Sequence, residues 1–150
     1  MATHSIPVQP ESLYDQDFIA WTEIMAEQLE KRDASALDWD HLAEEIRDLG
    51  RSFQHSLLSH LVNIQLHLIK WEIQAERRSR SWEDSISNSR LQADLLLEEI
   101  PSLRGYLRQN FEKCYDKAYR YALKETHMSK RTPYTRWPLE RVTDRGFLPD

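Results

Sequence analysis

The chain has 150 residues and a net charge of −5, with 30% charged residues, 40% hydrophobic residues and only three glycines. This composition excludes collagen-like, low-complexity and disordered chains, because five Trp, six Tyr and four Phe give the chain ample apolar surface to bury. One cysteine excludes an internal disulfide, and no apolar run approaches the roughly 20 residues of a membrane span. We expect a cytoplasmic domain over residues 13–150, after a flexible arm over residues 1–12 that lacks a signal-peptide pattern.

The first predicted helix follows the arm, over about residues 15–32. Its apolar residues recur every three or four positions, which places them on one helical face: Phe18, Trp21, Ile24 or Met25, and Leu29. Asp15 is suited to cap this helix, because its carboxylate accepts a hydrogen bond from a free amide of the first turn. The sequence Asp-Ala-Ser-Ala at residues 33–36 predicts a break after it.

The second predicted helix is the longest, over about residues 38–75, and Asp38 is its expected N-cap. Its apolar stripe keeps a spacing of three or four throughout: Leu42, Ile46, Leu49, Phe53, Leu57, Leu61, Ile64, Leu68 and Trp71. At 1.5 Å per residue, such a helix is about 55 Å long. Gly50 lies inside it, at a cost of about 1 kcal/mol relative to alanine, and marks either a kink or a close approach of another helix.

Two further helices are predicted on either side of Pro101. The third begins at Ser81, which forms a capping-box pattern with Asp84, and its apolar face comprises Trp82, Ile86, Leu91 and Leu95 or Leu96. The fourth covers residues 101–127, with the stripe Leu103, Leu107, Phe111, Cys114, Ala118, Tyr121 or Ala122, and Glu125. No segment alternates polar and apolar residues as a strand does. The predicted fold is therefore all-α, an antiparallel bundle of about four helices with one long central helix and an irregular C-terminal tail.

The charge is unevenly distributed along the chain. Residues 1–50 carry 12 acidic and 3 basic side chains, whereas residues 101–150 carry 6 acidic and 11 basic ones. An acidic first third and a basic last third favour pairing of opposite charges, either inside one chain or head to tail between copies. The alternative is that these charges are simply solvated.

Carboxylates and an imidazole gather at the start of the second helix: Asp38, Asp40, His41, Glu44, Glu45 and Asp48. His41 and Glu45 are four residues apart, so they are neighbours on one helical face. A divalent metal held by His41, Glu45 and His67 is one hypothesis, although His41 precedes Glu44 by three, the reverse of the Glu-x-x-His order of di-metal bundles. The alternative is a solvated acidic helix start with no cofactor.

Two histidines lie beside the apolar seam of the second helix. His60 and His67 are two turns apart, about 10.5 Å, which is too far for both to bind one ion directly. Glu125 and His127 at the end of the fourth helix are further ligand candidates if the helix ends meet. The alternative is that both histidines are half-buried and hydrogen-bonded to a neighbouring carboxylate. Cys114 lies on an apolar stripe, where a cysteine behaves as a small hydrophobic residue.

Basic residues suggest a nucleic-acid surface in two places. The loop Arg77–Arg80 lies between Trp71 and Trp82, and bases interleaved with tryptophan can contact phosphates and stack on nucleobases. The helix predicted over residues 101–127 carries bases broadly on one side: Arg104, Arg108, Lys113, Lys117, Arg120 and Lys124. The alternative is that the tryptophans form a corner of the core and the bases are solvated.

The order of these motifs resembles a bacterial, mainly cyanobacterial family catalogued as domain of unknown function 29. The matching stretches are Tyr14-Asp15-Gln16-Asp17-Phe18 with Trp21, Leu37-Asp38, Leu42-Ala43-Glu44-Glu45-Ile46, Leu66-His67-Leu68-Ile69-Lys70-Trp71, Trp82, Pro101-Ser102-Leu103, Ala118, Glu125, Pro138-Leu139 and Phe147-Leu148-Pro149. The resemblance covers about residues 13–149. It implies an all-α fold and no established activity. It brings forward the polar positions Asp38, Glu44, Glu45, His67, Lys70 and Glu125. Glu125 extends an apolar stripe, so we expect it to face inward, with Glu44, Lys70 and Glu125 forming either a buried ion-pair network or a catalytic centre.

Three functions remain open on the sequence alone. The first is an interaction module that self-associates or docks on a partner protein, because a 55 Å helix exceeds a compact domain of this size and leaves apolar surface for another chain. The second is a metal-assisted hydrolase or nuclease, such as one component of a toxin–antitoxin pair, with candidate catalytic residues Glu44, Glu45, His67, Lys70 and Glu125. The third is a weak nucleic-acid binder. We favour the first.

Overall fold

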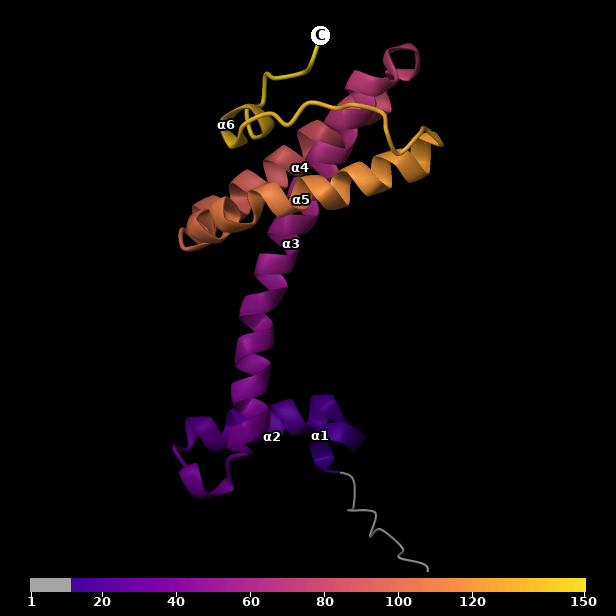
Figure 1. Ribbon diagram of the computed structural model, residues 1–150. Coiled ribbons are helices and arrows are strands. Elements are labelled where there is room, and N and C mark those ends of the chain that lie inside the picture. Colours follow the sequence, from indigo (N-terminus) through magenta and orange to yellow (C-terminus); the bar gives the residue numbers. More distant parts are fainter. Residues whose placement is uncertain (1–11) are drawn as a thin grey trace, which may run out of the picture. The chain divides into compact units, whose positions relative to one another are not determined.

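The computed structural model describes residues 12–150 (Figure 1). Its regular elements are α1 (Leu13–Gln16), α2 (Phe18–Glu30), the 3-10 turn η1 (Ala34–Ala36), α3 (Trp39–Ile73), the 3-10 turn η2 (Ala75–Arg77), α4 (Arg80–Glu99), α5 (Leu103–Thr126) and α6 (Leu139–Val142). No strand occurs in this part of the chain, and α3 is the long helix that the sequence predicts. The all-α class and the long central helix are therefore confirmed. The arm predicted over residues 1–12 lies outside the described residues, except for Ser12.

The contacts within the chain divide it into two compact units. Unit 1 ends at Leu49, and its described part is residues 12–49; unit 2 comprises residues 50–150. The helix α3 contributes residues to both units, and it continues through Gly50. A Cβ at Gly50 would meet no described atom within 4 Å, so this glycine makes no close approach to another helix of the chain. The single domain predicted over residues 13–150 stays a prediction.

Unit 1 begins with two short helices where the sequence predicts one. The backbone of Asp17 is not helical, with φ −150° and ψ 89°, and its carboxylate accepts a hydrogen bond from the amide of Ala20. Asp17 therefore caps α2, while Ser12 caps α1 by accepting from the amide of Asp15. The expected cap at Asp15 is wrong, because the capping geometry of Asp17 divides the helix. The break predicted at residues 33–36 is confirmed, and η1 occupies it.

Unit 2 is built on the antiparallel hairpin of α4 and α5, against which the later turns of α3 pack (Figure 1). The buried core comprises Leu57, Leu61, Ile64, Leu66, Leu68, Ile69, Ile86, Ala93, Leu97, Leu103, Leu107, Phe111, Cys114, Tyr115, Ala118, Ala122 and Val142. The helix α4 begins earlier than predicted, because Ser79 rather than Ser81 caps it by accepting a hydrogen bond from the amide of Trp82. Cys114 is buried in this core, as its stripe position predicts.

The face of α4 that packs into the core differs from the predicted one. The buried residues of α4 are Ile86, Ser89, Arg90, Ala93 and Leu97. Leu91, which the sequence assigns to the apolar face, is instead 42% exposed; of the alternatives Leu95 and Leu96, Leu95 is 46% exposed and Leu96 packs against the core. The predicted Ile86 belongs to the buried set, but an arginine and a serine occupy two of its other positions, so a search for apolar residues alone misses part of the buried face.

The irregular tail after α5 lies across the helices of unit 2, seen in yellow in Figure 1. Side chains from the helices hold its backbone. The buried hydroxyl of Tyr115 donates to the carbonyl oxygen of Trp137 at 2.6 Å, and that of Tyr119 donates to Thr132 at 2.7 Å. The indole of Trp71 donates to Pro149 at 3.0 Å. The tail is thus part of the folded unit, although α6 is its only helix.

No helix within residues 12–150 has the length and apolarity that a membrane span requires.

Candidate functional site

Unit 1 contains a cluster in which α1 contacts the start of α3. The ring of Tyr14 stacks on the imidazole of His41, with 3.8 Å between centroids, and its hydroxyl donates to Oε1 of Glu45 at 2.5 Å. This hydrogen bond, together with burial and the charge of Glu45, raises the pKa of Tyr14 to about 12. Tyr14 therefore stays protonated at neutral pH and remains a donor to the carboxylate.

The second half of this cluster orients an imidazole. The indole of Trp21 donates to Oδ2 of Asp38 at 3.1 Å, and the same oxygen lies 2.6 Å from Nδ1 of His41. The hydrogen bond with His41 is the main reason why the pKa of Asp38 is lowered, and it likewise raises the pKa of His41. Asp38 thus favours the charged imidazolium and fixes which ring nitrogen faces it, a geometry that general bases and structural caps share.

Only some of the candidate site residues of unit 1 lie together in this cluster. His41 and Glu45 are brought together, because Tyr14 contacts both. Glu44 is exposed, and its charge contributes only as a further cause of the raised pKa values of Tyr14 and His41. Tyr14 and Trp21 were not among the predicted site residues. Their aromatic character appears in the sequence, but their polar partners lie 31 and 17 residues away.

In unit 2, Lys70 is the buried member of an ion pair. Its Nζ lies 2.7 Å from Oε2 of Glu125 and 4.5 Å from the ring centroid of Trp82, and the residue is only 9% exposed. The sequence expectation that Glu125 faces inward is wrong, because this residue is exposed and its carboxylate reaches back to Lys70. The pair is consequently half-solvated and is not the buried network that was expected. Glu44, the third expected member, belongs to unit 1.

His67 is a half-buried histidine whose partner is a backbone group. Its Nδ1 lies 2.9 Å from the carbonyl oxygen of Asn63, one turn earlier, rather than near a carboxylate. Burial is the main cause that lowers the pKa of His67, and the charge of Lys70 lowers it further. The pKa of His60 is lowered by burial as well. Both imidazoles are therefore biased toward the neutral form.

The three proposed metal ligands are divided between the units, with His41 and Glu45 in unit 1 and His67 in unit 2. Within residues 12–150, no group of three or more His, Cys, Asp or Glu side chains is placed to hold a metal ion. The metal site stays a prediction.

Arg90 is a buried cation that sequence reasoning missed. It is 2% exposed, its Nε donates to the carbonyl oxygen of Val142 at 2.9 Å, and its Nη1 donates to Phe147 at 2.8 Å. Its Nη2 is buried with no hydrogen-bond partner in the described part of the chain. Burial lowers the pKa of this guanidinium, while the nearby charges of Asp144 and Asp94 raise it. The signal was present, because Arg90 follows Ile86 by four and precedes Ala93 by three.

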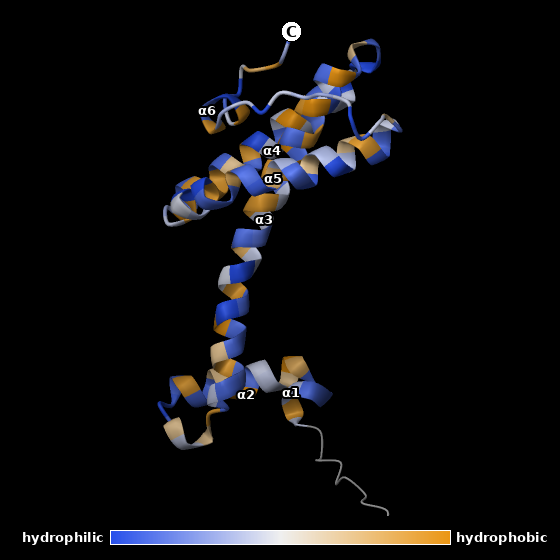
Figure 2. Ribbon diagram, in the orientation of Figure 1, coloured by the Kyte–Doolittle hydropathy of each residue, from blue (hydrophilic) through white to orange (hydrophobic). Residues whose placement is uncertain are grey.

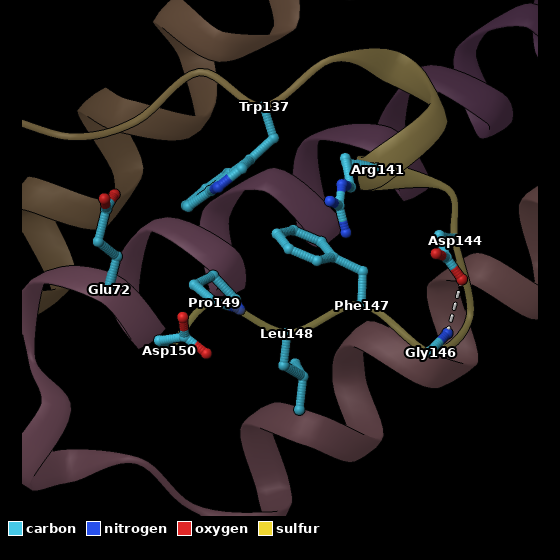
Figure 3. A pocket seen from close by; sticks show the side chains of 9 residues that line it. All are labelled: Glu72, Trp137, Arg141, Asp144, Gly146, Phe147, Leu148, Pro149 and Asp150. Atoms are coloured by element: carbon cyan, nitrogen blue, oxygen red, sulfur yellow. Dashed lines mark hydrogen bonds between the residues drawn. The ribbon is translucent and has the colours of Figure 1, made fainter.

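A pocket of about 640 Å³ lies between the tail and the end of α3 (Figure 3). Its lining residues are Glu72, Trp137, Arg141, Asp144, Gly146, Phe147, Leu148, Pro149 and Asp150. The rings of Trp137 and Phe147 meet edge to face at 5.9 Å, and the guanidinium of Arg141 lies 5.3 Å from the Phe147 ring. None of the nine lining residues is a serine, cysteine or histidine, so the pocket itself offers no common nucleophile or imidazole base.

A second hollow, of about 440 Å³, lies at the C-terminal end of α5. We call it the α5 hollow, and it is lined by Tyr119, Arg120, Leu123, Lys124, Met128 and Lys130. A smaller hollow of about 260 Å³ shares two of these residues and adds Lys117 and Tyr121. The α5 hollow therefore has apolar and aromatic walls bordered by three cations.

One arginine of the basic loop predicted over residues 77–80, Arg78, is built into the fold, whereas Arg77 and Arg80 are exposed. Nε of Arg78 donates to the carbonyl oxygen of Trp71 at 2.8 Å, and its guanidinium lies 5.3 Å from the Trp71 ring centroid. A second nitrogen of Arg78 donates to the backbone of Asp150. Arg78 thus joins the end of α3 to the C-terminal tail, which agrees with the alternative that Trp71 and its neighbours form a corner of the core. Whether the remaining bases bind nucleic acid stays a prediction.

The comparisons with known proteins bear on the whole chain. A family model described as "Domain of unknown function DUF29" matches residues 13–148. The chain belongs to the DUF29 family. The resemblance read from the sequence is confirmed, over nearly the same residues. The comparisons with curated proteins and with solved structures found no match.

The part of this DUF29 chain that most resembles an interaction surface is unit 1. Of its described residues, only Trp21 and Met25 are buried. Eight large hydrophobic residues are exposed by 40% to 69%: Leu13, Phe18, Ile19, Ile24, Leu29, Trp39, Ile46 and Leu49. Figure 2 shows these apolar stretches, in orange, interleaved with hydrophilic ones along α2 and the first turns of α3. The apolar stripe of α3 is thus buried from Leu57 to Leu68, whereas Ile46, Leu49 and Phe53 before it are exposed.

Proposed function

We propose that this DUF29 protein is a helical interaction module that self-associates through the apolar surface of unit 1. The observation that carries the proposal is the imbalance in this unit, where eight large hydrophobic residues are exposed and two are buried. Exposed apolar patches on a folded unit are typical of protein–protein contact sites. Ile46 and Leu49 are the most direct candidates, because they continue the stripe that is buried elsewhere along α3.

The size of unit 1 supports the same proposal. Unit 1 comprises residues 1–49, and units below about 60 residues bury a smaller fraction of their surface than larger domains and are only marginally stable on their own core. The one cysteine of the chain is Cys114, in unit 2, so no internal disulfide is available to unit 1. Contact with another polypeptide supplies the missing apolar burial.

A second copy of the chain is the partner that best fits this need. If unit 1 is stable only when its apolar surface is buried by a partner, that partner has to be present whenever the protein is folded. Another copy is always present at the same concentration, whereas a different protein is not. Self-association also allows the closed symmetry that most soluble oligomers adopt.

The proposal is tested by measuring the molar mass of the full chain by light scattering over a range of concentrations. We expect a dimer or larger oligomer for the natural sequence and a monomer for the double variant Ile46→Gln with Leu49→Gln. Glutamine suits a helix and removes apolar surface without adding charge. The matched control is Leu91→Gln with Leu95→Gln, two exposed leucines of α4 in unit 2, which should keep the natural mass. A natural chain that stays monomeric at high concentration contradicts the proposal.

Hydrolysis is a second candidate function, and the Asp38–His41 pair favours it. An imidazole held by a carboxylate at 2.6 Å has the arrangement of a general base, and Glu45 lies within the same cluster. The test is a panel of nitrophenyl esters and phosphates, with and without added divalent cations. Loss of a measured activity in His41→Gln supports this function, and an activity that survives the substitution removes His41 from it.

A further inference from the structure

We propose that the α5 hollow of one copy binds the acidic unit 1 of a second copy of this chain. This inference rests on the proposed self-association and names the surface that unit 1 meets. It is an interaction between two different surfaces, one acidic and one basic, each with exposed apolar side chains.

The α5 hollow has the chemistry of a receptor for an acidic, partly apolar helix. Its walls include Leu123, Met128 and the ring of Tyr119, and its edges carry Arg120, Lys124 and Lys130. No acidic side chain of residues 12–150 forms an ion pair with any of these three cations. A volume of about 440 Å³ accommodates one or two apolar side chains, while the cations remain available for carboxylates.

Unit 1 has the complementary composition. Residues 12–49 carry 11 acidic and 3 basic side chains, so the bases of this unit cannot neutralise its acids. On α2, the exposed Ile19 lies one turn from Glu23, and Glu23, Glu27 and Glu30 follow at spacings of four and three on one face. Glu27 already pairs with Lys31, whereas no ion pair is formed by Glu23 or Glu30 in the described chain. This face combines apolar and acidic groups as the hollow combines apolar and basic ones.

Electrostatics favours this pairing over contact between two copies of unit 1 alone. Two surfaces that each carry an excess of eight negative charges repel each other at short range, and like charges brought together at an interface cost several kcal/mol. The cations of the α5 hollow remove that repulsion. They also increase the association rate, because opposite fields steer the two chains together.

The proposed contact is compatible with a closed oligomer. Each copy carries one unit 1 and one α5 hollow, and most soluble oligomers close reciprocally about a two-fold axis. The expected product is a closed dimer with two identical contacts.

The experiment is a charge exchange in the full chain, read as molar mass by light scattering. The first variant is Arg120→Glu with Lys124→Glu, and the second is Glu23→Lys with Glu30→Lys. We expect each alone to weaken the dimer by about tenfold or more, and an equimolar mixture of the two to recover it, since every contact is then again between opposite charges. The matched control is Arg104→Glu with Arg108→Glu, which reverses the same charges on the first turns of α5, away from the hollow.

Several outcomes overturn the inference. A dimer that tolerates Arg120→Glu with Lys124→Glu but is lost in Ile46→Gln with Leu49→Gln leaves self-association intact and removes the α5 hollow from it. A natural chain that is monomeric removes both proposals. If the charge reversal leaves the mass unchanged and abolishes binding of a labelled single-stranded oligonucleotide, the hollow is a nucleic-acid surface instead. Failure of the mixed variants to restore the dimer also contradicts direct pairing.

Discussion

Nε of Arg90, in the middle of α4, donates a hydrogen bond to the carbonyl oxygen of Val142, 52 residues later in the chain. The same guanidinium donates to Phe147, so one buried side chain holds two points of the C-terminal tail. The carbonyl group of Val142 is at the C-terminal end of α6 and that of Phe147 is in the irregular segment after it, where no following helical turn supplies a hydrogen bond. Arg90 therefore supplies hydrogen bonds to backbone carbonyl groups of the tail, which in regular secondary structure would come from backbone amides.

We predict that Arg90→Met destabilises unit 2 by about 3 kcal/mol, since a charged donor is lost and two carbonyl groups lose their partner. Methionine keeps most of the side-chain volume, which limits the cavity contribution. The measurement is urea unfolding of the full chain.

The matched control for Arg90 is Arg145→Met, also on a contact between α4 and the tail. Arg145 pairs with Asp94 at 2.9 Å, but its side chain is 65% exposed. An exposed pair of this kind contributes about 1 kcal/mol or less. Equal effects of the two substitutions would show that burial of Arg90 is not what stabilises the tail.

We predict that removing the charge of Glu125 costs more unfolding free energy than removing the charge of Lys70, although the two form one ion pair. The side chain of Lys70 is 11% exposed, and that of Glu125 is 46% exposed. Glu125→Gln therefore removes the carboxylate from a buried ammonium ion, leaving it the ring of Trp82, whereas Lys70→Met leaves a carboxylate that water can solvate. We expect Glu125→Gln to cost about 1–2 kcal/mol in urea unfolding and Lys70→Met to cost less. A larger cost for Lys70→Met would contradict this order.

The helices could be predicted because their apolar spacing is a local property of the sequence. The stripe from Leu57 to Leu68 is buried as its period indicates, and Ile100 before Pro101 ends α4 where the proline requires. Caps were less predictable, since Ser79, Ser81, Asp15 and Asp17 are all good capping residues. Only the backbone geometry decides among them.

Lys70 and Glu125, which the sequence predicts to lie together, do pair, but most other polar contacts could not be predicted, because their partners are distant in sequence or belong to the backbone. His67 bonds to the carbonyl of Asn63, and no side-chain pattern reports a backbone acceptor. Tyr14 reaches Glu45 across 31 residues. Arg90 occupies a position of the apolar stripe, where a search by hydrophobicity passes over it. Sequence periodicity locates a buried face, but it does not say which polar groups that face accommodates.

The pKa values of two histidines should be displaced from the ordinary value in opposite directions. The pKa of His41 is raised above its ordinary value of 6.5, chiefly by its hydrogen bond to Asp38, whereas burial lowers the pKa of His67 below that value. Nuclear magnetic resonance titration of the imidazole protons should show midpoints on either side of 6.5. Asp38→Asn should lower the midpoint of His41 and leave that of His67 unchanged, because the two residues belong to different units.

The two histidines also make the stability of the folded chain change with pH in opposite directions. Because folded His41 holds its proton more tightly, its contribution is fully present below pH 6.5 and is lost as the pH rises through its folded pKa. The lowered pKa of Asp38 limits this contribution on the acid side, where it is lost below 3.8. For His67, the unfolded chain binds the proton more tightly, so stability is lost as the pH falls below 6.5. Hydrogen exchange at about pH 5 and about pH 9, corrected for the intrinsic rate, should show His41→Gln weakening α2 mainly at the lower pH. Equal weakening of α2 at both pH values would mean that the Asp38–His41 hydrogen bond does not depend on the charge of the imidazole.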